Sequence, residues 1–249
     1  MISNNQPTCD WITPDWPAPE NIHACSTTRS GGVSKNQYAT LNLANHVGDH
    51  SEDVLENRKR LREQLRLPVD PTWIEQVHGC HIVQVDQVDS LVKADASFTR
   101  TSQSICAVMT ADCLPILLCD KKGQFIAAIH AGWRGLAQGI IEKTVNLANA
   151  NNLLAWLGPA IGPTCFEVGI DVYNQFVLHS PALNQVFRPH QNKKWLADLY
   201  LLAKMKLSAV GVKQIYGGQF CTYSDPQRFF SYRRDGETGR MATLIWRSY

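Results

Sequence analysis

The chain has 249 residues, of which 44% are hydrophobic and 18% are charged, so it can bury a sizeable core in one or two domains. Its net charge of +2 and the absence of any Lys/Arg block argue against a nucleic-acid-binding surface. Residues 1–16 lack the pattern of a signal peptide, and no apolar run is long enough to cross a bilayer. We therefore expect a single cytoplasmic domain, residues 1–249, that binds neither nucleic acid nor membrane.

The first part of the chain predicts few regular elements. Residues 7–19 form an irregular lead-in, and residues 23–29 predict a short strand. Residues 51–67 predict a helix, because a capping serine and two acidic residues begin the segment and a proline follows it. Residues 73–77 and 81–85 predict two strands or one bent strand.

The middle of the chain is rich in apolar runs. Residues 104–109, 114–119 and 125–129 predict strands, and the turn residues 120–123 join the last two as a hairpin. Because these last runs are nearly all apolar, both faces of their sheet are expected to be covered.

The remaining segments carry helix patterns and strand patterns in turn. This alternation favours a mixed sheet with helices packed outside it. The predicted helices are residues 136–150, 171–179 and 194–211, and the predicted strands are residues 153–157, 213–216 and 241–246.

Eight cysteines are present, at irregular spacings and without a C-x-x-C pair. A disulfide framework is not expected without a secretory signal, so most of them should be small buried hydrophobes.

Three short segments, each next to an apolar run, carry His78, Cys113 and His130. Imidazole and thiolate are good ligands for zinc, and three protein ligands leave a fourth position for water or substrate. The pattern therefore predicts a catalytic metal site. Cys80 and His81 are competing candidates beside His78, and in an extended chain Cys80 would share a face with His78.

Cys113 has a second interpretation, as a nucleophile activated by a nearby histidine. The preceding residue, Asp112, would either cap a turn or orient a metal ligand.

The loop after His130 contains two glycines and opens a helix, so Arg134 and free backbone N–H groups could hold an anion. The alternative is an ordinary turn with Trp133 packed inside. Arg29, before a Gly-Gly pair, is a further candidate anion contact, or a solvated surface residue.

Glu167, in the loop 158–169, is a candidate acid/base or substrate-positioning group. The alternative is that its charge only compensates the start of the next helix. Tyr223 and residues 231–235 are candidates for the rim of the site.

Across nearly its whole length the chain resembles the YfiH-like family, long called the polyphenol oxidase or laccase domain. The similarity rests on the three ligand segments and on residues 27–34, 41–43, 158–169, 221–224 and 231–241.

This resemblance implies an α+β fold with a layered α/β/β/α arrangement of mixed β-sheets, similar to that of Cys–His hydrolases. It implies one zinc ion on the positions of His78, Cys113 and His130. Asn42, which lies in one of the matching segments, is a candidate substrate contact together with Arg29 and Arg134. It also implies phosphorolysis of adenosine, inosine, guanosine and S-methyl-5′-thioadenosine, together with adenosine deamination.

Our leading hypothesis is therefore a zinc-dependent purine nucleoside phosphorylase with adenosine deaminase activity, in which Cys113, His130 and Glu167 are catalytic. Its partners would be nucleosides and phosphate, and the chain would be a monomer. The alternatives are a Cys–His hydrolase, an enzyme editing peptidoglycan precursors, a non-catalytic purine- or metal-binding protein, and a copper-binding polyphenol oxidase. A full multicopper centre is not supported, because the chain has eight histidines and no His-x-His pair.

Overall fold

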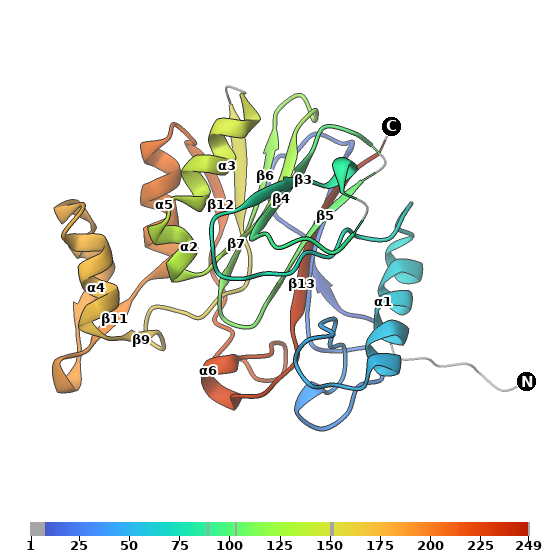
Figure 1. Ribbon diagram of the computed structural model, residues 1–249, viewed down its shortest axis with the longest axis horizontal. Helices are drawn as coiled ribbons and strands as arrows, with labels where there is room; N and C mark the ends of the chain where they lie inside the picture. Colours follow the sequence, from blue (N-terminus) through green and yellow to red (C-terminus); the bar gives the residue numbers. More distant parts are fainter. Residues whose placement is uncertain (1–7, 89, 103, 150–151, 249) are drawn as a thin grey trace, which may run out of the picture.

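A computed structural model describes residues 8–88, 90–102, 104–149 and 152–248, which form stacked layers of helix and sheet (Figure 1). The central layer is a mixed six-stranded sheet. Its strands follow the order β12 (Gln214–Gly217), β8 (Leu153–Leu157), β6 (Leu114–Asp120), β7 (Ile126–Ala131), β4 (Ala96–Thr99) and β3 (Ile82–Gln84).

A second sheet of four antiparallel strands packs against the first. Its order is β1 (Trp11–Ile12), β2 (Ile22–Thr27), β13 (Met241–Arg247) and β5 (Ile105–Thr110). A small third sheet contains β10 (Phe187–Pro189), β11 (Trp195–Ala197) and β9 (Glu167–Val168).

The helices lie outside the two large sheets. They are α1 (Ser51–Leu65), α2 (Trp133–Ala137), α3 (Ile140–Ala148), α4 (Ile170–Val177), α5 (Leu199–Ala209) and α6 (Tyr232–Asp235). Short 3₁₀ helices cover Asn36–Tyr38, Val85–Gln87, Pro181–Val186 and Gln191–Lys193. None of the helices in the described ranges is long and apolar enough to span a membrane.

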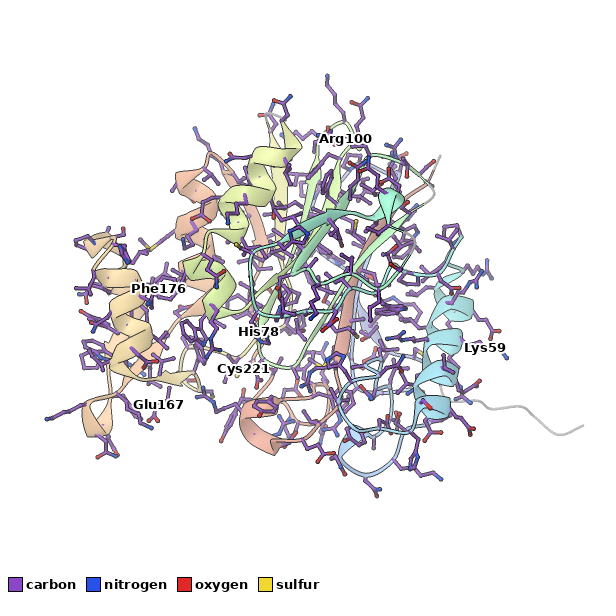
Figure 2. The ribbon with its side chains drawn as sticks, viewed as in Figure 1. Lys59, His78, Arg100, Glu167, Phe176 and Cys221 are labelled. Atoms are coloured by element: carbon purple, nitrogen blue, oxygen red, sulfur yellow. The ribbon has the colours of Figure 1, made fainter. Side chains whose placement is uncertain are left out.

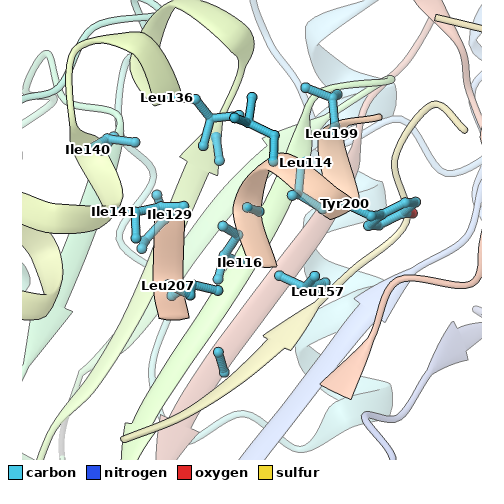
Figure 3. Close-up of a cluster of buried hydrophobic side chains, with 14 of the residues drawn as sticks. Leu114, Ile116, Ile129, Leu136, Ile140, Ile141, Leu157, Leu199, Tyr200 and Leu207 are labelled. Atoms are coloured by element: carbon cyan, nitrogen blue, oxygen red, sulfur yellow. The ribbon is translucent and has the colours of Figure 1, made fainter. Parts of the chain in front are cut away.

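The side chains of β6 and β7 alternate between two cores. Ile116 and Ile129 pack under α2, α3 and α5 (Figure 3), whereas Leu117 and Ala128 face the four-stranded sheet. Both faces of the strands are therefore buried, which explains their almost uninterrupted apolar runs. On the outer face of the four-stranded sheet, Leu61 of α1 closes a third cluster. The predicted α/β/β/α layering is confirmed.

Three predicted elements differ from the observed ones. The helix expected over residues 136–150 divides into α2 and α3, because Gly139 adopts a φ of 82° between them. The helix expected from residue 194 begins only at Leu199, where the Asp198 side chain caps it by accepting from Leu201 N. Residues 73–77 contain one isolated bridge, between Glu75 and Lys93, instead of a strand. Residues 7 and 150, at the ends of two predicted segments, lie outside the described residues.

Candidate metal centre

The side chains of His78, Cys113 and His130 converge at one end of the six-stranded sheet. One donor atom from each lies within 4.8 Å of the others. Sγ of Cys113 is 3.8 Å from Nε2 of His78, and the two imidazole rings meet edge to face with their centroids 4.7 Å apart. Zinc binds thiolate at about 2.3 Å and imidazole at about 2.0 Å, so one ion could contact all three donors.

The register of the β6–β7 hairpin places Cys113 beside His130. Leu114, at the start of β6, pairs with Ala131 at the end of β7, and Pro115 pairs with His130, so Cys113 and His130 lie at the same end of the two strands. Gly132 then leaves room for the donors. A Cβ at Gly132 would lie 3.1 Å from Sγ of Cys113 and 3.2 Å from Cδ2 of His78. A larger residue would therefore crowd two of the three ligands.

A left-handed backbone conformation separates His78 from Cys80. His78 has a φ of 59°, so the segment is not extended and the alternation considered for an extended chain does not apply. His78 joins the cluster of metal donors, whereas Sγ of Cys80 contacts Nζ of Lys143 on α3. The backbone conformation thus directs His78 and Cys80 to different partners, although the two side chains would share a face in an extended strand.

The carboxylate of Asp95, immediately before β4, contacts two of the three segments that carry His78, Cys113 and His130. It accepts hydrogen bonds from the backbone N–H groups of Val77, His78 and Gly79, at 3.3, 2.9 and 2.6 Å. Its Oδ1 also lies 2.8 Å from Nδ1 of His130, and Asp95 is fully buried. One carboxylate therefore orients the His78 loop and the His130 ring together.

Gln76 fastens the same loop to the second sheet. Its side-chain amide donates to the carbonyl of Met109, and its side-chain oxygen accepts from Met109 N, both at 2.7 Å. The His78 loop is thus held by β5 as well as by β4, which limits the motion of its imidazole.

Cys113 and His130 perturb each other's protonation in the absence of a metal ion. Burial opposes a charge on the Cys113 thiol, but the neighbouring His130 and His78 outweigh burial and lower its pKa to about 6. Burial likewise opposes a charge on His130, yet the Cys113 thiolate and the Asp95 carboxylate raise the His130 pKa to about 9. The two groups therefore favour a thiolate–imidazolium pair near neutral pH.

Asp112 anchors a distant segment instead of a metal ligand. Its Oδ1 accepts from the Thr222 hydroxyl at 2.6 Å, and its Oδ2 accepts from Arg233 N at 2.7 Å. Of Asp95 and Asp112, Asp95 is the one that contacts the ring of a candidate ligand, His130.

The metal-ligand cluster opens into a cavity of about 520 Å³. Three aromatic residues and three arginines share its wall with the ligands. The lining residues are His46, Gln76, His78, Met109, Thr110, Ala111, Asp112, Cys113, His130, Trp133, Arg134, Ile161, Phe166, Tyr232, Arg233 and Arg240.

Each cavity arginine stacks on an aromatic ring of the same wall. The guanidinium carbon lies 4.4 Å from the ring centroid for Arg134 over Trp133, and 5.3 Å for Arg233 over Phe166. The third pair is formed by Arg240 over Tyr232, at 5.8 Å. In the part of the chain that the structure describes, none of the three arginines forms a salt bridge with a carboxylate. The wall thus carries positive charge that favours an anion.

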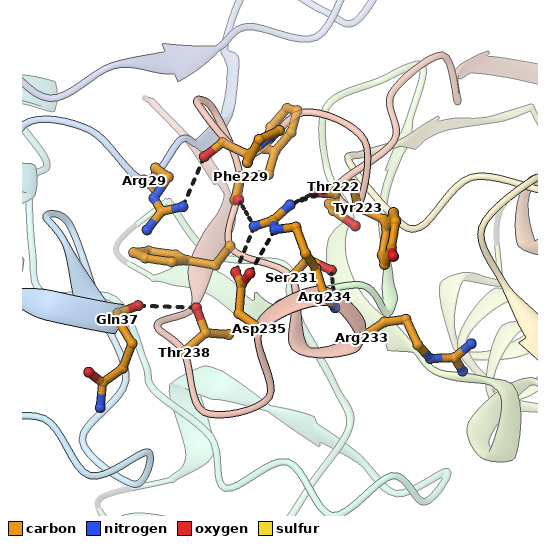
Figure 4. Close-up of polar contacts among 12 residues, drawn as sticks. Arg29, Gln37, Thr222, Tyr223, Phe229, Ser231, Arg233, Arg234, Asp235 and Thr238 are labelled. Atoms are coloured by element: carbon orange, nitrogen blue, oxygen red, sulfur yellow. Dashed lines mark hydrogen bonds and ion pairs between the residues drawn. The ribbon is translucent and has the colours of Figure 1, made fainter.

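Arg234 holds the rim segment in place (Figure 4). Its guanidinium donates to the carbonyls of Thr222, Tyr223 and Phe229 and pairs with Asp235 at 2.7 Å. This fixed turn carries Tyr232 and Arg233, the two members of the predicted rim 231–235 that line the cavity.

Two of the residues predicted to bind substrate lie outside the cavity lining. Arg29 donates to the carbonyls of Ala39 and Pro226, both at 2.9 Å, and stacks on Phe230. Asn42 is fully buried, and its side chain accepts from Arg240 N at 3.0 Å. Arg134, the third predicted substrate contact, does line the cavity.

Glu167 lies toward the α4 side of the molecule, away from the central position of His78 (Figure 2). Its carboxylate accepts from Lys194 at 2.6 Å, and this hydrogen bond lowers the Glu167 pKa. Its backbone carbonyl accepts from the Arg233 guanidinium at 2.8 Å. Glu167 therefore contacts the cavity through Arg233.

Sequence reasoning missed Asp95 and the role of Arg240 in the cavity. Asp95 is 35 residues from His130 along the chain and 16 to 18 residues from the loop that it binds. Its sequence neighbours form no motif, so only the paired strands reveal its contacts.

The chain thus belongs to a class of proteins with layered sheets and a His/Cys/His cluster at one end of the central sheet. The profile of the family described as "Multi-copper polyphenol oxidoreductase laccase" matches residues 23–248, so the chain is a member of that family.

Named relatives are similar to nearly the whole chain. The chain is 50% identical to a protein of Escherichia coli (strain K12) named purine nucleoside phosphorylase YfiH, over 94% of this chain and 98% of that one. It is 50% identical to a purine nucleoside phosphorylase of Pseudomonas aeruginosa, over 95% and 98%. These relatives are named as enzymes, and we conclude that this chain is an enzyme of the same family.

Solved structures agree with the fold. A Neisseria meningitidis protein of the family called DUF152 superposes with a TM-score of 0.93 at 45% identity, covering 96% of this chain and 99% of that one. YlmD from Geobacillus stearothermophilus superposes with a TM-score of 0.87 at 31% identity, covering 96% of each chain.

Proposed function

We propose that this chain is a zinc-dependent purine nucleoside phosphorylase that also deaminates adenosine. Its substrates are phosphate and the nucleosides adenosine, inosine, guanosine and S-methyl-5′-thioadenosine. The observation that carries the proposal is a single cavity lined by three side chains that could hold a metal ion and by three arginines, none of which forms a salt bridge with a carboxylate among the described residues. The names of the two relatives support the same reaction class.

The donor set suits a zinc ion. Two imidazoles and a thiolate are typical zinc ligands, Gly132 leaves them space, and Asp95 fixes two of the ligand segments. Copper competes for the same donors, because its intrinsic affinity for such ligands is higher. When bound, the ion would act as a Lewis acid toward a substrate oxygen or a water molecule.

Arg134, Arg233 and Arg240 are our candidates for holding phosphate. A planar guanidinium can donate two parallel hydrogen bonds to phosphate oxygens, and stacking on an aromatic ring restricts its orientation beforehand. Bound in this way, phosphate would be kept close to the reacting bond, which lowers the entropic part of the barrier.

The aromatic side chains of the cavity suit the purine ring. Trp133, Phe166 and Tyr232 supply apolar faces against which a planar base could pack. We propose that the base lies among these rings, and that His46, on the same wall, is a polar group available to its edge or to the ribose.

The roles expected for three other residues change accordingly. We propose that Glu167 positions Arg233 through its carbonyl, since its ionised carboxylate is engaged by Lys194. Asn42 would act on the site indirectly, by holding the backbone of Arg240, whereas Arg29 would hold the segments of Ala39 and Pro226 together.

A Cys–His hydrolase is the second candidate function, favoured by the lowered pKa of Cys113 beside His130. Here Cys113 would be the nucleophile, with His130 as its base. The variant Cys113→Ser separates the two candidates. Loss of both metal and activity supports the metal site, whereas retained metal with lost activity supports the nucleophile.

The proposal is tested by product analysis after incubation with adenosine, with and without phosphate. Phosphate-dependent release of adenine and phosphate-independent formation of inosine are the expected results. If zinc-loaded protein forms neither adenine nor inosine, the proposal is overturned and the hydrolase is favoured. We expect the enzyme to work in the cytoplasm as a monomer, which size-exclusion chromatography with light scattering would check.

A further inference from the structure

Cys80 and Lys143 form a contact that an ordinary hydrogen bond does not explain. Nζ of Lys143, on α3, lies 2.7 Å from Sγ of Cys80, in the loop that carries His78. An N–H···O hydrogen bond typically measures about 2.9 Å between heavy atoms, and sulfur is larger than oxygen. The separation is therefore too short for a hydrogen bond to sulfur, and it is too long for a direct sulfur–nitrogen bond.

The distance suits two single bonds that meet at one shared atom. Oxygen forms single bonds to both sulfur and nitrogen, and thiols take up oxygen when they are oxidised. We propose that Cys80 and Lys143 form a redox modification site at which one oxygen atom links Sγ to Nζ covalently.

The surroundings of the pair support this reaction. Cys80 is partly exposed and Lys143 is exposed, so a small oxidant can reach both side chains. Within the described residues Lys143 forms no salt bridge, and the adjacent Glu142 pairs with Lys206 at 2.7 Å. By contrast, Cys106 and Cys119 are fully buried and out of reach of solvent.

A peroxide supplies both the oxygen and the oxidising power. The Cys80 thiol takes one oxygen atom from a first peroxide molecule, which gives a sulfenic acid and one water. A second peroxide molecule oxidises the sulfenic acid and the Lys143 amine together. The S–O bond is kept, an O–N bond forms, and the O–H hydrogen and one N–H hydrogen leave in two waters. One hydrogen remains on Nζ.

The bridge would restrain the loop of a metal ligand. In the reduced protein the segment around His78 is held by the Asp95 carboxylate and by the Gln76 amide. A covalent link at Cys80 adds an attachment to α3 two residues from His78. We therefore expect the oxidised protein to release its metal to a chelator more slowly than the reduced protein.

Peptide mapping by mass spectrometry tests the proposal on the metal-loaded protein treated with hydrogen peroxide. The peptides that contain Cys80 and Lys143 should appear joined, with a mass equal to their sum plus one oxygen and less two hydrogens. A thiol reductant should separate them, and trypsin should fail to cut after Lys143 while they are joined.

Three variants complete the experiment. Cys80→Ser and Lys143→Arg should each abolish the joined product and the slower metal release. Cys165→Ser is the matched control and should keep both, because Cys165 is also partly exposed but its hydrogen-bond partner is the Thr164 hydroxyl.

Three results would overturn the proposal. The first is a sulfenic or sulfinic acid on Cys80 with Lys143 unlinked. The second is a joined product that lacks the added oxygen, and the third is an unchanged Cys80 under conditions that oxidise Cys165.

Discussion

Oδ1 of Asp95 lies 2.8 Å from Nδ1 of His130, and both side chains are almost fully buried. When Nδ1 donates to this carboxylate, the lone pair of Nε2 is left free for a metal ion. The same carboxylate accepts from the backbone around His78, so one residue outside the proposed ligand set fixes the geometry of two candidate ligands.

Asp95→Asn should weaken metal binding by roughly tenfold to a hundredfold, as is usual when a carboxylate behind a ligating histidine is lost. The asparagine amide has only one accepting oxygen, where the aspartate has two. At least one backbone N–H of the His78 loop therefore loses its acceptor. Competition with a zinc-binding dye measures the affinity.

Asp86→Asn is the control for this prediction. Asp86 accepts from the Thr99 hydroxyl and the Gln84 amide and contacts none of the ligands. Equal zinc affinities for the two variants would show that Asp95 has no special role in the centre.

Gly132→Ala should reduce metal affinity by about tenfold, by moving ligands out of position, with little effect on folding. Gly132 has a φ of −67°, which alanine adopts without strain, so the expected damage comes from the new methyl group beside Cys113 and His78. Zinc affinity and melting temperature should be measured on the same sample in the metal-free and metal-loaded forms. A lowered melting temperature of the metal-free form with unchanged affinity would contradict this explanation.

Arg233→Gln and Arg240→Gln should raise the KM for phosphate roughly tenfold to a hundredfold, because each removes charged hydrogen bonds to the anion. The KM for the nucleoside should change much less. Arg228→Gln is a suitable control, because Arg228 also stacks on aromatic rings, those of Phe220 and Phe229, but lies outside the cavity lining.

Arg29→Gln tests whether Arg29 binds phosphate, as the sequence suggested, or only holds its own segment in place. The guanidinium of Arg29 is committed to two carbonyls and to Phe230, so the variant should lower the melting temperature and leave the KM for phosphate nearly unchanged. A selective rise in that KM would return Arg29 to the phosphate site.

Alkylation of Cys113 in chelator-treated protein should depend on pH in an unusual way. His130 and His78 lower the thiol pKa to about 6, so the reactive thiolate should predominate at pH 7 and disappear as the pH falls through 6. An ordinary thiol, with a pKa of about 8.5, gains reactivity only above neutral pH. Rates of iodoacetamide labelling from pH 5 to 9 measure this profile, and a midpoint above about 8 would contradict it.

Much of the layered core follows from local patterns in the sequence. The three apolar runs that became β5, β6 and β7 were predicted with nearly their observed bounds, since strands buried on both faces leave a distinct signature. The three residues that the structure brings together as possible metal donors were also singled out, because each stands next to an apolar run. The division of one predicted helix at Gly139 was not foreseen, since glycine within a helical pattern does not by itself require a break.

The surroundings of the metal donors depend on contacts between distant segments. Asp95 reaches His130 only because β4 pairs with β7, and Arg233 reaches the cavity because Asp112 and Arg234 fix its turn. No local pattern encodes these pairings. The left-handed conformation of His78, which separates it from Cys80, likewise depends on the Asp95 carboxylate that holds the loop.

Removal and return of the metal tests the central claim most directly. Protein stripped by a chelator is assayed for hypoxanthine release from inosine with phosphate present, and then assayed again after addition of zinc or copper. The account predicts that stripping abolishes the release and that one zinc per chain restores it, in the wild type and not in Cys113→Ser. Full activity in stripped protein, with no metal detected by mass spectrometry, would contradict it.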